Sequence, residues 1–125
     1  MAYITTDDIT DSIKGNFDLS GYITRADSEI INLARRFGLV ESQIIEPIDY
    51  VIKQWAVSWV LMQLCLDKIG ASNSADIAND KYVLKYDIYQ KRTWDYYKRI
   101  TKEMFTNVVY NQSDMVSMTA QIYRG

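Results

Sequence analysis

The chain has 125 residues, of which 48% are apolar and 24% charged, and its net charge at pH 7 is -2. This composition is typical of a single folded domain with one hydrophobic core. Cys65 is the only cysteine and histidine is absent, which excludes an internal disulfide, a mixed Cys/His zinc site and Cys/His or Ser/His catalytic pairs, so we expect no catalytic, cofactor-binding or metal-binding residues.

The first part of the chain predicts two helices. Between Thr5 and Gly15, threonine and aspartate side chains precede Ile9 and Ile13, a pattern that favours a short helix with a capped N-terminus and one apolar face. The second helix is predicted to end at Gly38. Its apolar residues recur at the spacing of one buried stripe: Ile23, Ala26, Ile30, Leu33, Ala34 and Phe37.

A third helix is predicted to begin at Pro47, because proline has no N–H to leave unpaired there, and its apolar pattern continues over residues 48–69. It is apolar almost all round, which is typical of a central helix packed on several sides. We expect Trp55, Trp59 and Leu66 in the core, and Cys65 beside them as a buried, inert thiol.

Neither a membrane span nor a signal peptide is predicted. The uncharged stretch between Lys53 and Asp67 is far shorter than the roughly 20 residues that cross a bilayer. Residues 1–10 have no basic side chain and no continuous apolar run, so we expect a protein made in the cytoplasm.

A polar stretch at residues 70–79 is predicted to be a long loop. Asp80 then suits the cap of a fourth helix over 80–106, in which apolar and aromatic residues alternate steps of four and three like a coiled-coil seam. The seam residues are Tyr82, Tyr86, Tyr89, Thr93, Tyr96, Ile100 and Met104.

The sequence after residue 107 has a different pattern. Residues 116–122 alternate apolar and polar side chains, which is typical of a half-buried strand. No other strand is predicted, so the partner would be a sheet edge in another protein; the alternative is a disordered or surface-draped tail.

The predicted fold is therefore all-α, a compact bundle of about four helices in a domain over 1–107, followed by an extended tail over 108–125. The tail residues expected to bind a partner are Val116, Met118, Ala120, Ile122 and Tyr123.

Charge is distributed unevenly along the chain. Residues 1–80 contain 6 basic and 12 acidic side chains, whereas residues 81–102 contain 7 basic and 2 acidic ones. The basic helix indicates either a charged partner or an ordinary solvated face. Its tyrosines favour protein contacts over stacking on nucleic acid, and the pI near 5 agrees. We expect subunit-interface or channel-facing positions at Lys81, Lys85, Lys91, Arg92, Lys98, Arg99 and Lys102.

Three segments taken together suggest a family. They are the opening at residues 3–9, the stretch from Ile23 through Glu29 and Ile30 to Gly38, and the Ile45-Glu46-Pro47 start of the apolar helix. This arrangement resembles the head-to-tail connector, or head-completion adaptor, proteins of tailed bacteriophages, in which a short helix, a second helix and a proline-started core helix form a compact body.

The resemblance implies a structural protein of the virion neck, made in the host bacterial cytoplasm. It would form a homo-oligomeric ring, usually a dodecamer, that binds the portal protein and a tail or stopper protein. Genome DNA would pass through the ring without sequence-specific contacts, and the tail would grip the portal. Two alternatives remain at this point: a small nucleic-acid-binding regulator that uses residues 81–102, and an antitoxin-like inhibitory partner.

Overall fold

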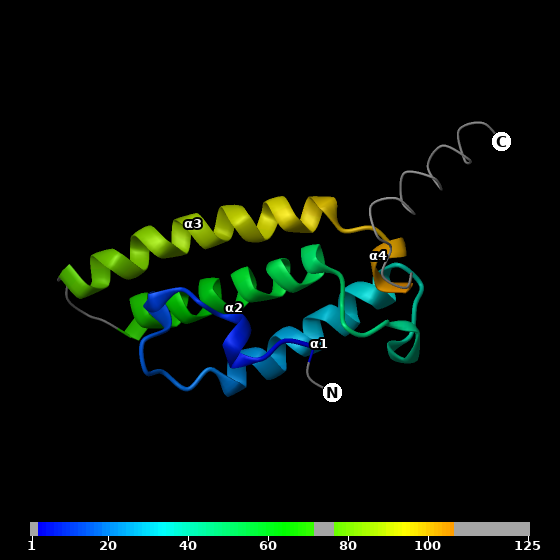
Figure 1. The fold of residues 1–125 in the computed structure, drawn as a ribbon. Coiled ribbons are helices and arrows are strands. Elements are labelled where there is room, and N and C mark those ends of the chain that lie inside the picture. The colour runs from blue at the N-terminus through cyan, green and yellow to red at the C-terminus, as the bar shows by residue number, and fades with distance from the viewer. Residues whose placement is uncertain (1–2, 72–76, 107–125) are drawn as a thin grey trace.

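The computed structural model describes residues 3–71 and 77–106 (Figure 1). The described chain forms three long helices, α1 (Ser20–Arg36), α2 (Tyr50–Ala71) and α3 (Ile77–Arg99), and the single-turn α4 (Glu103–Thr106). Three 3-10 turns connect them: η1 (Thr6–Asp8), η2 (Ser12–Lys14) and η3 (Glu41–Gln43). The predicted all-α fold is confirmed. The tail over 108–125, with its predicted strand, lies outside the described residues.

Helix α2 lies between α1 and α3 in one layer of helices (Figure 1). It can occupy the centre because its apolar side chains point in nearly every direction. Helix α3 runs antiparallel to it, with the ring of Tyr97 at 6.5 Å from that of Trp55 near the start of α2. The buried residues of α2 are Ile52, Trp55, Ala56, Val57, Ser58, Val60, Leu61, Leu64 and Cys65.

Helix α1 has the buried apolar stripe that the sequence predicts. Five of the six predicted apolar residues are buried, and the sixth, Phe37, is partly buried. The helix ends at Arg36, and the chain turns away at the predicted stop, Gly38, whose φ of 84° is easily adopted only by glycine. The N–H groups of Gly38 and Leu39 bond to the carbonyls of Arg35 and Ala34, so the last turn of the helix has its acceptors satisfied.

The predicted first helix is wrong. Residues 5–15 form η1 and η2, separated by extended backbone at Ile9. The aspartates bind nearby backbone instead of supporting one continuous helix: Asp8 accepts from the N–H of Thr5 at 2.8 Å, and Asp11 from that of Ile13 at 2.9 Å. Ile9 and Ile13 are both buried, as the apolar face of the predicted helix would have been.

The predicted helix boundaries also need correction. Pro47 precedes α2 instead of starting it, because Asp49 caps the helix by accepting from the N–H of Val51 at 2.8 Å. Helix α2 continues to Ala71 and α3 begins at Ile77, so residues 70–71 and 77–79 of the predicted loop are helical.

Helix α3 ends at Arg99, before the predicted end at residue 106. The chain turns at the buried Ile100 so that Phe105, which has no exposed surface, can pack 5.8 Å from Phe37. The carbonyl of Phe105 accepts from the N–H of Ile45 at 2.8 Å. A straight helix would have carried Phe105 away from these partners.

Candidate docking surface

The N-terminal arm, residues 3–19, covers one face of the helix layer (Figure 1). On α1, the buried carboxylate of Asp27 accepts from the N–H groups of Tyr3 and Ile4 at 2.9 and 3.3 Å. On α2, the Lys53 ammonium lies 3.5 Å from Asp8. The arm therefore binds both of these helices on the same side of the layer.

On α3 the arm is held by Asp11. Its carboxylate accepts a hydrogen bond from the Tyr89 hydroxyl and lies 3.0 Å from the Lys85 ammonium. Burial acts to raise the pKa of Asp11, but the bonds from Tyr89, Ile13 and Lys85 outweigh it and hold that pKa below its usual value. Burial, followed by the bond to Asp11, raises the pKa of Tyr89. The hydrogen bond from Tyr89 and the ion pair with Lys85 therefore hold the arm against α3.

The opposite face of the layer is found by counting along each helix. A residue nine positions away on an α-helix points to the other side, because nine steps of 100° make two and a half turns. Nine residues after Asp27, Lys53 and Lys85 come Arg36, Met62 and Trp94. These three side chains line one groove on the face that the arm leaves uncovered.

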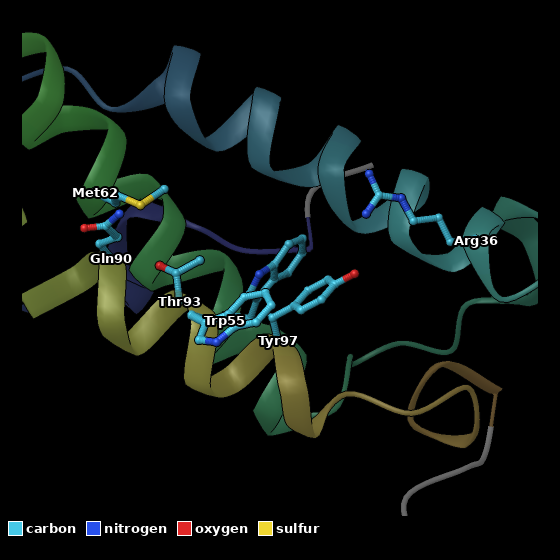
Figure 2. A pocket seen from close by; sticks show the side chains of 7 residues that line it. Arg36, Trp55, Met62, Gln90, Thr93 and Tyr97 are labelled. Carbon is cyan, nitrogen blue, oxygen red and sulfur yellow. The ribbon is translucent and has the colours of Figure 1, made fainter.

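The groove has a volume of about 560 Å³ (Figure 2). Figure 2 places Met62 and Gln90 at one end, and Tyr97 at the other end nearer Arg36. Its floor is aromatic, because Trp94 stacks on Tyr97 with centroids 5.6 Å apart and an interplanar angle of 15°. The lining residues are Arg36, Trp55, Met62, Gln90, Thr93, Trp94 and Tyr97.

Apolar surface continues beyond the groove along the same face. Trp94 is 58% exposed, Val83 lies three turns before it on α3 with 45% exposed, and Leu66 lies one turn after Met62 with 44% exposed. The prediction that Leu66 belongs to the core is therefore wrong, since no element in residues 3–71 and 77–106 covers this side of α2. We call this surface the open face; its residues are Trp55, Trp59, Met62, Leu66, Val83, Trp94 and Tyr97.

The second predicted core tryptophan, Trp59, is only partly buried, while Trp55 is buried as predicted. Trp59 lies at the border between α1 and α2, where the Arg25 guanidinium sits 5.5 Å from its ring centroid. Arg25 also lies 5.9 Å from the Tyr22 ring, and the Tyr22 hydroxyl donates to Asp67 at 2.6 Å. Burial, together with Asp67, raises the pKa of Tyr22 to about 12. Polar groups thus border the open face on its α1 side.

Six of the seven predicted basic side chains contact a carboxylate or a tyrosine ring. Three of the lysines pair with carboxylates: Lys85 with Asp11, Lys91 with Asp87 and Lys98 with Asp95, at 3.0, 3.0 and 3.7 Å. Three further cations lie over tyrosine rings at 4.8 to 5.3 Å, and the seventh, Lys102, follows the end of α3. Those three pairs are Lys81 with Tyr82, Arg92 with Tyr89, and Arg99 with Tyr96.

The predicted tail residues Val116, Met118, Ala120, Ile122 and Tyr123 lie outside the described part of the chain. Sequence reasoning missed the groove, because Arg36, Met62 and Trp94 each look like unremarkable members of a helix. Trp94 could have indicated the groove, because it lies outside the tyrosine seam although it is the largest apolar side chain of its helix.

Cys65 is buried as predicted, and burial raises the pKa of its thiol to about 11. In residues 3–71 and 77–106, no group of three or more Cys, Asp or Glu side chains is placed to hold a metal ion. None of the helices in these ranges is both long and apolar enough to cross a membrane.

Comparisons with known proteins give no relative. No family model, no curated protein and no solved structure matches this chain. An inference about function therefore depends on the surfaces described above and on the sequence itself.

Proposed function

We propose that this chain is a structural adaptor of the head-to-tail connector type, which forms a ring under the portal of a tailed bacteriophage and continues the DNA channel toward the tail. The observation that carries the proposal is the open face, a contiguous apolar and aromatic surface on the side of the layer opposite the N-terminal arm. The kind of assembly is inferred from the resemblance of the first 70 residues to the connector family.

The open face is suited to contacts between proteins. Tryptophan, tyrosine, methionine and arginine are enriched at protein interfaces, and all four types line this groove. Trp94 is rigid and stacked, so little conformational entropy is lost when a partner covers it. Large exposed apolar patches on small domains mark interaction sites.

A ring also needs a second, different surface on each copy, because head-to-tail contacts join unlike patches. The outer edge of α3, which faces away from α2, carries Leu84 with 67% and Ile88 with 40% of its surface exposed. In the proposed ring, the outer edge of one copy meets its neighbour, and the open face meets either that neighbour or the portal.

The alternative, a nucleic-acid regulator that reads DNA with residues 81–102, receives less support. Binding of phosphates needs free cations on one surface. Here Lys85, Lys91 and Lys98 each have a carboxylate within 4 Å, and the other cations of α3 lie over tyrosine rings of the same helix. Weak, salt-sensitive binding of duplex is all that this arrangement favours.

The test is binding of the purified chain to the portal protein encoded in the same genome, measured by co-sedimentation. Trp94→Asp should weaken binding at least tenfold, because it places a charge in the open face. The control is Tyr50→Ala, which alters a similarly exposed aromatic residue outside the groove and should change affinity by less than about twofold. Equal effects of the two variants, or no binding by the native chain, would contradict the proposal.

A further inference from the structure

The groove of the open face lies close to the point where the described chain stops. Helix α4 ends at Thr106, directly after Phe105, whose ring packs 5.8 Å from that of Phe37. Phe37 follows Arg36, which lines the groove at its Tyr97 end (Figure 2). The described chain therefore ends at α4, beside one end of the groove.

The tail is long enough to follow the groove. Its 18 residues span up to about 60 Å when extended. The open face from Tyr97 to Val83 covers 14 residues of helix, which is about 21 Å. The tail can therefore cross from α4 to the groove and run along it with residues to spare.

The chemistry of the tail matches the groove. Apart from Asp114 and Arg124 it has no charged side chain, and two of its apolar residues are methionines, which make favourable contacts with aromatic rings such as Trp94. Residues 116–122 alternate apolar and polar side chains, so an extended backbone presents one apolar edge. Val116, Met118, Ala120 and Ile122 form that edge.

We infer that, in the isolated chain, the tail docks in the open-face groove of its own body, with Met118 and Ile122 against the aromatic floor. A tether that starts beside the groove gives the tail an effective concentration in the millimolar range, so even weak contacts keep the groove occupied. The docked tail covers Trp94 until a partner displaces it. This inference concerns the free chain and holds or fails independently of the proposed connector role.

Cysteine cross-linking in the full chain tests the inference. The test variant combines Met118→Cys with Gln90→Cys, because Gln90 is exposed and lines the groove. The matched control combines Met118→Cys with Lys91→Cys, because Lys91 is the next residue and is exposed on the outer edge of α3. The native Cys65 is fully buried and stays in place. Mild oxidation should give an intrachain disulfide at least fivefold faster with the groove position, at a rate independent of protein concentration.

A second readout uses the fluorescence of the native tryptophans, without added cysteines. Met118→Asp with Ile122→Asp should release the tail and raise the acrylamide quenching constant about twofold, since Trp94 becomes accessible. Ser117→Asp with Gln121→Asp adds the same charge on the opposite edge and should leave quenching unchanged. Equal cross-linking at positions 90 and 91, or equal quenching in the two double variants, would overturn the inference. Cross-links that form only between chains would also overturn it and identify a second copy as the occupant.

Discussion

Asp27 offers a sharp test of how the N-terminal arm is held. Its buried carboxylate is the acceptor for two backbone N–H groups, those of Tyr3 and Ile4. Asp27→Ala removes the acceptor and leaves both donors without a partner. A buried unpaired donor costs about 1–3 kcal/mol, and the 3.3 Å bond to Ile4 is the weaker of the two, so we expect a loss of about 2–4 kcal/mol in unfolding free energy.

Asp27→Asn separates hydrogen bonding from charge. The asparagine side-chain oxygen can accept from the same two N–H groups, while the cost of burying a carboxylate disappears. Burial raises the pKa of Asp27 despite the bonds from Tyr3 and Ile4. A raised folded-state pKa means that ionisation destabilises the fold, so this penalty is present at pH 7 and vanishes as pH falls below the unfolded value near 4.

Urea unfolding followed by circular dichroism measures both variants. At pH 7 we expect Asp27→Ala to lower the midpoint strongly and Asp27→Asn to match or exceed the native chain. The advantage of the Asn variant should shrink toward pH 4. The reasoning is refuted if Asn and Ala destabilise equally, or if the difference between Asn and the native chain grows as pH falls.

Three further predictions concern the interior. Tyr89→Phe should cost about 1 kcal/mol at pH 7 by removing the bond to Asp11; because that bond lowers the Asp11 pKa in the fold, the cost should shrink in urea melts below about pH 4, and a cost equal at pH 3 and 7 would count against it. Cys65, with its raised thiol pKa, should resist iodoacetamide at pH 8 in the folded chain and react in 6 M urea; rapid labelling of the folded chain would refute its burial. Leu64→Ala should cost about 2–5 kcal/mol in thermal or urea unfolding, whereas Leu66→Ala should cost less than about 1, and equal losses would place Leu66 in the core after all.

The sequence predicted the helical architecture because long periodic segments carry their own signal. The stripe of α1 and its stop at Gly38 were readable from spacing alone. The tyrosines of the predicted seam are buried or partly buried along α3, as at Tyr89 and Tyr96, although its last two members, Ile100 and Met104, lie beyond the end of that helix. Each of these features depends on residues within one helix.

Features that depend on several elements were not predictable. Leu66 lies on an apolar helix in the same way as Leu64, and it is exposed because no element of the described part of the chain packs on that side. The arm over residues 5–15 looked like a helix because its aspartates suit a cap, yet they bind nearby backbone amides instead. The groove joins Arg36, Met62 and Trp94, whose separation in sequence hides their proximity.

The proposal that the chain is a ring-forming adaptor is tested most directly by native mass spectrometry of the full chain mixed with the portal ring of the same genome. The account predicts a chain that is largely monomeric alone and a complex that carries one copy per portal subunit, twelve on a twelve-fold portal, because only the template closes the head-to-tail contacts into a ring. A chain that stays monomeric beside the portal, while binding duplex DNA with nanomolar affinity and sequence preference at physiological salt, would contradict the account.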